Sequence, residues 1–431
     1  MINIIDLPER ELWASLAARP SFESGMLQGS VAEILRSVEQ GGDKALLSFT
    51  QNIDGVSLDS VLVSEQELLG VEDNLDDELI DAINVARENI AKFHSAQIRE
   101  AVEVETMSGV LCRQRSLPIK RVGLYIPGGS APLFSTLLML AVPARIAGCS
   151  EIVIATPPRK DGTVAPAILY IAKLLGISEI VKAGGAQAIA ALAFGTESVK
   201  RVSKIFGPGN QFVSEAKIQV SKRVAIDMLA GPSEVMVIAD ESANPAFVAS
   251  DLLAQAEHGA DSQVFLLTTS ARLAKECAAE TEKQLALLSR SSIASKALEN
   301  SRIIITKTLD EAIDFANYYA PEHLIINTVE SWTDAYKVES AGSIFVGNYS
   351  SESAGDYASG TNHTLPTSGW AVSSGGVSLD SFLHKITYQE ITEEGLLNIS
   401  KTIETMALAE GLGGHRNSVR LRREYINRGR S

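Results

Sequence analysis

The stretch Arg121-Val-Gly-Leu-Tyr-Ile-Pro-Gly-Gly-Ser130 decides the fold class. Its first six residues form a short apolar run typical of a buried strand, the glycines indicate a turn, and a helical pattern continues through Leu140. The same succession of apolar run, turn residues and helical stretch recurs along most of the chain after residue 120. This alternation predicts βα units and a parallel sheet.

Two series of such units are expected, separated near residue 233. Strands are predicted at 121–126, 151–155, 179–182 and 204–206, then at 235–238, 264–267, 302–306, 324–327 and 343–346. An amphipathic helix is expected at 75–94, and the last fifty residues are helical. The fold class is therefore α/β, with two Rossmann-like parallel-sheet domains and a helical C-terminal tail. The expected boundaries are 1–21 for an N-terminal helical segment, 22–124 with 234–377 for the main domain, 125–233 for the second domain and 378–431 for the tail.

Composition limits the classes of partner. The chain has 431 residues, of which 45% are hydrophobic, and a net charge of -15. An acidic surface repels phosphate backbones, so we expect no nucleic-acid partner. The most apolar stretch, 133–144, is too short to cross a membrane, and no secretion signal is visible, so a cytoplasmic protein is expected. Cys112, Cys149 and Cys277 are far apart and predict reduced, mostly buried thiols rather than disulfides.

Several polar residues lie where chemistry is expected. Gln255 and His258 are three apart near a helix end and share one face, which suits a ligand pair or simply a polar helix end capped by Gly259. Glu322 and His323 stand at the entrance to a strand, where an acid and an imidazole suit general acid–base work. Asp356 and His363 lie in the irregular, Gly- and Ser-rich stretch 348–380, as ligands or as turn-forming residues.

The C-terminal helix carries a further candidate. Glu410 continues an apolar stripe that ends at Met406, which would point a carboxylate inward, and His415 follows the glycines after it. A frayed helix end with a solvated Glu410 is the alternative. Gly207-Pro-Gly-Asn-Gln-Phe212 is a near miss to a dinucleotide turn, with Phe212 where the third glycine belongs and Asp227 at about the acidic position. Spacing alone diagnoses no metal site.

Taken together, these segments resemble the histidinol dehydrogenase family over about residues 20–425. The motifs that carry the resemblance are Val122–Gly129, Gly184–Ala190, Phe206–Asn210, Ala230–Glu234, Gln255–Gly259, Pro321–Leu324 and Ser353–His363. Each is weak alone, but seven in the right order are specific. Two rival hypotheses are a thiol-dependent aldehyde dehydrogenase and a metal-dependent binding or sensor protein.

The resemblance implies zinc and NAD as cofactors and L-histidinol as substrate, oxidised through the aldehyde to L-histidine. It implies that Glu322 and His323 are the acid–base pair. The implied zinc ligands are Gln255, His258, Asp356 and His415; the implied substrate contacts are these four with Ser233, His323, His363 and Glu410; the implied NAD contacts are Tyr125, Gln187 and Asn210. It also implies an intertwined homodimer in which the tail, with Glu410 and His415, reaches the partner's site.

Overall fold

The computed structural model describes residues 2–20, 24–128, 132–228 and 231–429. The chain forms two compact units, a first unit of Met1–Gln97 with Ile119–Phe382 and a second unit of Ile98–Pro118 with Leu383–Ser431. Three residues of the quoted motifs, Gly129, Ser130 and Ala230, lie outside the described residues. Among those described, no helix combines the length and the apolar character needed to cross a bilayer.

A five-stranded parallel sheet confirms the first predicted series. Its order is β6-β5-β4-β7-β8. The strands are β4 (Arg121–Tyr125), β5 (Glu151–Thr156), β6 (Glu179–Lys182), β7 (Lys204–Phe206) and β8 (Ala225–Ile226), and the helices between them are α5 (Phe134–Ala147), α6 (Pro166–Leu174), α7 (Gly185–Phe194) and α8 (Gln211–Val220). Alternate strand residues feed two cores, one against α5 and α6 and one against α7 and α8. Only the two-residue β8 was not predicted.

A six-stranded parallel sheet confirms the second series, with the order β1-β11-β10-β9-β12-β13. Its strands are β1 (Asn3–Asp6), β9 (Glu234–Ala239), β10 (Gln263–Thr268), β11 (Arg302–Ile305), β12 (His323–Asn327) and β13 (Ser343–Val346). Leaving β1 aside, both sheets place their strands in the Rossmann order, third, second, first, fourth and fifth. The two Rossmann-like units of the prediction are therefore present.

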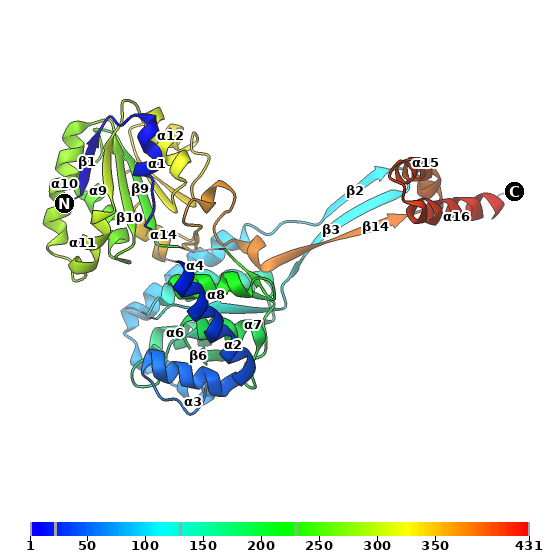
Figure 1. The fold of residues 1–431 in the computed structure, drawn as a ribbon, viewed down its shortest axis with the longest axis horizontal. Coiled ribbons are helices and arrows are strands. Elements are labelled where there is room, and N and C mark those ends of the chain that lie inside the picture. Colours follow the sequence, from blue (N-terminus) through cyan, green and yellow to red (C-terminus); the bar gives the residue numbers. More distant parts are fainter. Residues whose placement is uncertain (1, 21–23, 129–131, 229–230, 430–431) are drawn as a thin grey trace. The chain divides into compact units, whose positions relative to one another are not determined.

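Helices cover both faces of the six-stranded sheet (Figure 1). One face carries α9 (Pro245–Ala256), α10 (Ala271–Leu285) and α11 (Ser291–Glu299), and the other carries α1 (Trp13–Leu16), α12 (Leu309–Tyr319) and α13 (Ser331–Ala335). The expected N-terminal helical segment 1–21 is wrong in part, because the chain begins with strand β1. This strand pairs with β11 at the sheet edge, and η1 (Arg10–Leu12) and α1 follow it.

Residues 24–95 pack against the five-stranded sheet, which differs from the expected main domain of 22–124 with 234–377. In α2 (Ser24–Phe49), apolar residues such as Val31 and Val38 share a core with the alanines of α7. In α4 (Asp77–Ser95), Ile83 and Ile90 pack on the apolar face of α5. Short elements connect these helices: η2 (Thr50–Asp54), α3 (Glu65–Leu68) and η3 (Val71–Asn74). Periodicity identified the buried face of the helix at 75–94 but not the sheet that covers it.

The second unit is a three-stranded antiparallel sheet with two helices (Figure 1). Strand β3 (Val110–Pro118) lies between β2 (Val102–Met107) and β14 (Leu383–Ile391). Helices α15 (Glu393–Ala409) and α16 (Gly413–Gly429) follow β14 and pack on each other. The predicted tail of 378–431 is thus helical only in its later part. These strands were not predicted. Residues 102–107 read VEVETM, an apolar and polar alternation that is typical of a strand, and this signal was overlooked. Strand β14 was assigned to the helical tail.

Candidate active site

The candidate acid, base and ligand residues of the first unit lie at the amino-terminal ends of the strands in the six-stranded sheet. Strand β12 begins at His323, directly after Glu322, and its neighbour β9 begins at Glu234. Helix α9 follows the carboxyl end of β9 and runs back along the sheet. Gln255 and His258 at the end of this helix therefore lie near the amino-terminal ends of the strands. The topology thereby explains how a strand entrance and a helix end, distant in sequence, meet as predicted.

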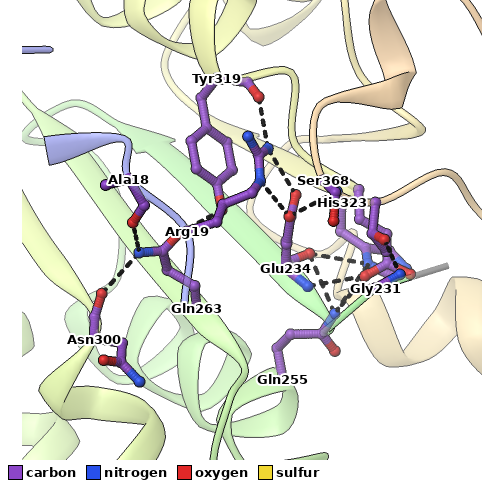
Figure 2. A network of polar contacts seen from close by, with 12 residues as sticks. Ala18, Arg19, Gly231, Glu234, Gln255, Gln263, Asn300, Tyr319, His323 and Ser368 are labelled. Carbon is purple, nitrogen blue, oxygen red and sulfur yellow. Dashed lines mark hydrogen bonds and ion pairs between the residues drawn. The ribbon is translucent and has the colours of Figure 1, made fainter. Parts of the chain in front are cut away.

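The backbone N–H and C=O groups of Glu234 hold Glu322 and His323 in place. The Glu234 backbone N–H donates to Glu322 Oε2 at 2.9 Å. The Glu234 carbonyl oxygen lies 3.3 Å from His323 Nδ1 and accepts a hydrogen bond of 3.2 Å from Gln255 Nε2. The same Gln255 nitrogen lies 3.2 Å from Glu322 Oε2 and 3.2 Å from His323 Nδ1. Figure 2 shows Gln255 and His323 beside Glu234 at the start of β9.

Two further carboxylates reach His323 from α14 (Glu352–Tyr357), within the irregular stretch 348–380. Asp356 Oδ1 lies 3.6 Å from His323 Nε2, and Glu352 Oε1 lies 4.0 Å from His323 Nδ1. His323, Glu352 and Asp356 each offer a ligand atom, and these atoms lie within 4.8 Å of one another. Glu352 was not predicted, because a single acid in a stretch expected to be irregular shows no spacing that marks it as a ligand, and its partner His323 is distant in sequence.

The electrostatics of this cluster favour positive charge at its centre. Burial lowers the pKa of His323, but the surrounding carboxylates, chiefly those of Glu352 and Glu322, outweigh burial and raise this pKa well above its usual value. Burial raises the pKa of the Glu352 carboxyl well above its usual value. Burial also opposes ionisation of Asp356, but contact with His323 and the nearby ring of His363 lower its pKa below the usual value.

Unsatisfied buried atoms test whether these residues fit a metal. Gln255 Oε1, His323 Nε2 and Glu352 Oε2 are buried, and none has a hydrogen-bond partner among the described residues. A buried polar atom without a partner is costly, so three together indicate a group that binds there. Imidazole nitrogen with carboxylate oxygen is a donor set that Zn²⁺ accepts, and an amide oxygen adds to it. The residues present therefore fit a zinc ion.

The predicted zinc ligands are distributed over both units. Gln255 and Asp356 lie at the cluster in the first unit. His258 is exposed in the turn after α9, and an electrostatic interaction between its ring and Asp356 contributes to the lowered pKa of Asp356, so the two residues lie near each other. The polar helix end capped by Gly259 is not observed, because the capping position is Glu257. His415 belongs to α16 of the second unit.

The remaining predicted substrate residues also differ in setting. Ser233 directly precedes β9 and is half-buried. The His363 ring lies between Asp356 and Thr136. Its Nδ1 is 2.9 Å from the Asp356 carbonyl oxygen, and its Nε2 is 3.1 Å from Thr136 Oγ1. Glu410 ends α15 and is exposed, and Met406 before it is 60% exposed. The end of this stripe, Met406 and Glu410, is therefore not buried within the second unit itself.

The predicted NAD contacts lie at the carboxyl end of the five-stranded sheet. Tyr125 ends β4, and its hydroxyl accepts a hydrogen bond from the Gly185 backbone N–H at 3.1 Å, while burial raises its pKa to about 12. Gln187 is buried in the first turn of α7. Asn210 caps α8 through its side-chain oxygen, which accepts from the N–H groups of Phe212 and Val213. β4 and β7 are adjacent at the point where the strand order reverses, which is the usual dinucleotide position in this fold.

The near-miss glycine turn has a structural cause. Gly207 adopts a φ of +124°, and a Cβ there would lie 2.0 Å from the Tyr125 carbonyl oxygen, so only glycine fits. Asp227 is not placed to meet a ribose. It is buried, forms an ion pair with Lys217, and accepts from the Gly207 N–H at 2.8 Å. Asp227 thus holds the Gly207–Asn210 loop in place through its hydrogen bond to Gly207.

The two buried cysteines, Cys149 and Cys277, oppose the thiol-dependent rival, whereas Cys112 is half-buried in β3. Cys149 and Cys277 are buried, and burial raises their pKa values to about 11 and about 12. A nucleophilic cysteine needs a lowered pKa and access to substrate. Neither thiol meets these conditions.

Two Rossmann-order sheets, with a buried cluster of imidazole, carboxylate and amide groups that fits zinc, are the arrangement expected of a metal-dependent α/β dehydrogenase. The family model described as histidinol dehydrogenase matches residues 17–423. The chain belongs to the histidinol dehydrogenase family, whose members are NAD-dependent oxidoreductases that require zinc.

Individual relatives agree over almost the whole chain. A histidinol dehydrogenase of Bacteroides thetaiotaomicron is 55% identical over 423 residues, covering 98% of this chain and 99% of the relative. One of Bacteroides fragilis is 53% identical over 428 residues, covering 99% and 100%. The crystal structure of histidinol dehydrogenase from Elizabethkingia anophelis superposes with a TM-score of 0.96 at 50% identity, covering 99% of both chains. The resemblance inferred from seven motifs is confirmed.

Proposed function

We propose that this chain oxidises L-histidinol through L-histidinaldehyde to L-histidine, with Glu322 and His323 as its acid–base pair. The observation that carries the proposal is the junction at the start of β9. There a buried imidazole and a buried carboxylate are held by the C=O and N–H groups of one residue, Glu234, beside Asp356, whose pKa is lowered. Buried titratable groups with strongly shifted pKa values at one point of a fold are typical of catalytic sites.

The residues divide the two oxidations between them. In the first, His323 accepts the hydroxyl proton of the alcohol while the carbon gives up a hydride. The imidazole must be neutral to do so, and a cation bound at the cluster would favour the neutral form by opposing the carboxylates that raise the His323 pKa. In the second, Glu322 accepts a proton from water, which adds to the aldehyde, and the hydrated carbon gives up another hydride. Glu322 receives two hydrogen bonds, from the Glu234 N–H and Gln255 Nε2, which orient its carboxylate. The acidic cluster also suits a substrate that carries an amine and an imidazole.

Cofactor residues are assigned by the same reasoning. Gln255, His258 and Asp356 of one chain would hold the zinc, with Glu352 and His323 adjacent, and Tyr125, Gln187 and Asn210 would contact NAD. Bound zinc supplies positive charge and a Lewis acid for the nitrogen atoms of the substrate, and bound NAD supplies the hydride acceptor. Ser233 and His363 flank the cluster as substrate contacts.

The dimer belongs to the same proposal. His415 and Glu410 are exposed in the second unit, and that unit leaves Met406, Leu421 and Tyr425 at least half exposed. Such apolar exposure favours burial against another chain. We infer a homodimer in which the second unit of one chain supplies His415 and Glu410 to the other chain's site. We also place the enzyme in the cytoplasm, because its three cysteines are free thiols.

One assay tests this function. NADH formed from L-histidinol is compared with NADH formed from L-histidinaldehyde, for the wild type and for Glu322→Gln. Two NADH per histidinol are expected in the wild type, and the variant should lose aldehyde oxidation by roughly 10²- to 10⁴-fold more than alcohol oxidation. Glu241→Gln, an exposed acid beyond the other end of β9, is the control and should keep both activities. Equal losses in both steps would contradict the role of Glu322.

A further inference from the structure

Arg19 makes an elaborate set of contacts for a residue in a connecting segment. It follows α1, and its Nε and Nη2 donate to the two carboxylate oxygens of Glu234 at 2.6 and 3.1 Å. Nη2 also donates to the Tyr319 carbonyl oxygen at 2.7 Å, and the guanidinium lies 3.9 Å from the centre of the Tyr319 ring. Figure 2 shows the Arg19 guanidinium between Glu234 and Tyr319. A planar, bidentate, stacked contact is specific to arginine.

Glu234 connects this contact to the acid–base pair. Its side chain is directed to Arg19, whereas its N–H and C=O groups face Glu322 and His323. The Glu234 carboxylate also accepts from the Ser368 N–H at 2.9 Å. The side chain is only 3% exposed, and burial raises its pKa, so the ionised form depends on Arg19 for its counter-charge.

The segment that carries Arg19 is itself anchored. Gln263 Nε2 donates to the Ala18 carbonyl oxygen at 3.0 Å and to the Asn300 carbonyl oxygen at 2.9 Å. The Tyr319 hydroxyl donates to Gln263 Oε1 at 2.8 Å. Both the guanidinium and the peptide before it are therefore fixed to the six-stranded sheet, which makes Arg19 a rigid reference point rather than a mobile surface cation.

We propose that Arg19 is a positioning residue for the reaction: its bidentate ion pair sets the Glu234 peptide groups, which in turn set Glu322 and His323. This inference rests on the proposed roles of Glu322 and His323. The Glu234 N–H donates a hydrogen bond to the Glu322 carboxylate. A rotation of the Glu234 backbone therefore moves Glu322 directly. Displacements of about 1 Å at a catalytic group cost on the order of 100-fold in rate.

The test compares three arginine variants in the zinc-loaded enzyme. Arg19→Met should lower kcat about 10- to 100-fold with KM for NAD unchanged. Arg19→Lys keeps the charge but not the two-pronged geometry, and should recover kcat only in part. Arg10→Met is the matched control, since Arg10 lies in the same N-terminal segment, stacks on Trp13 and pairs with Asp314 at the surface. It should leave kcat within twofold of the wild type.

A double-mutant cycle separates positioning from general loss of stability. If Arg19 acts through Glu322, Arg19→Met should slow aldehyde oxidation much less in a Glu322→Gln background than in the wild type. An equal effect in both backgrounds overturns the inference, as does a wild-type kcat in Arg19→Met. If Arg19→Met does not fold, Arg19→Lys carries the cycle, and full kcat in that variant overturns the inference. A Glu322→Gln enzyme with normal aldehyde oxidation would instead refute the proposed role of Glu322.

Discussion

Lys217 and Asp227 form a buried ion pair beneath the Gly207–Asn210 loop, and removing one partner should destabilise the protein strongly. Their side chains are 2% and 1% exposed. Lys217 Nζ also donates to the Gly207 carbonyl oxygen at 3.0 Å, while Asp227 accepts from the Gly207 N–H. Lys217→Met keeps the length and apolar stem of the side chain but leaves a buried carboxylate without its main cation.

The magnitude follows from this geometry. Breaking a buried ion pair by removing one partner costs about 3–5 kcal/mol, because the remaining charge stays desolvated. Lys204 also interacts with Asp227 electrostatically, so part of the charge remains compensated. We therefore expect the lower end, about 3 kcal/mol. Lys217→Met with Asp227→Asn should recover more than half of this loss, because the unpaired charge is gone.

Urea unfolding followed by circular dichroism measures the effect on the unfolding free energy. Lys222→Met, an exposed lysine just beyond the same helix, is the control and should differ from the wild type by under about 0.5 kcal/mol. KM for NAD should rise in Lys217→Met if the loop contacts NAD through Asn210. A loss under about 1 kcal/mol in Lys217→Met would refute the reasoning that burial makes this pair costly to break.

Three further predictions concern the candidate site. His323→Asn should lower kcat for alcohol oxidation by roughly 10²- to 10⁴-fold, while the exposed His384→Asn leaves it unchanged; near-normal turnover in His323→Asn would end the base assignment. Removal of metal with a chelator should abolish activity and lower the melting temperature, and added zinc should restore both; full activity in protein without detectable metal would exclude the zinc site. Burial raises the pKa of Asp251 to about 7, so the folded protein binds this proton more tightly than the unfolded chain, and the stabilisation it gives is lost as pH rises through about 7. Asp251→Asn should therefore flatten the decline in unfolding free energy between about pH 4 and about pH 7, and an unchanged decline would contradict the assignment.

Local patterning predicted the strands of both parallel sheets because buried parallel strands are short apolar runs bounded by turns. It did not reveal which sheet the helices of residues 24–95 cover, since an amphipathic stripe specifies a buried face and not its partner. Strand β1 was missed for a related reason: its four residues are mostly exposed at a sheet edge, so burial leaves little trace in its composition.

The candidate site, like the fold, was predicted only in part from the sequence. The motifs identified Glu322, His323, Gln255 and Asp356. The structure brings these four residues together at the amino-terminal ends of β9 and β12. Glu352 and Arg19 were not named, because their importance arises from contacts with residues distant in the sequence. Arg19 meets Glu234 across more than two hundred residues of chain, and no periodicity reports such a contact. Asp227 was noticed for its distance from a glycine turn, and its actual partner is Lys217.

The strand order of the second unit constrains when that unit can be completed during synthesis. β3 requires β14 on one side, yet β14 leaves the ribosome only after both parallel sheets have been made. Until then the β2–β3 hairpin has an open edge, and exposed edges recruit other strands. Nascent chains that stall between residues 118 and 383 should therefore be the most prone to aggregation, and their hairpins should need shielding by a chaperone until translation ends.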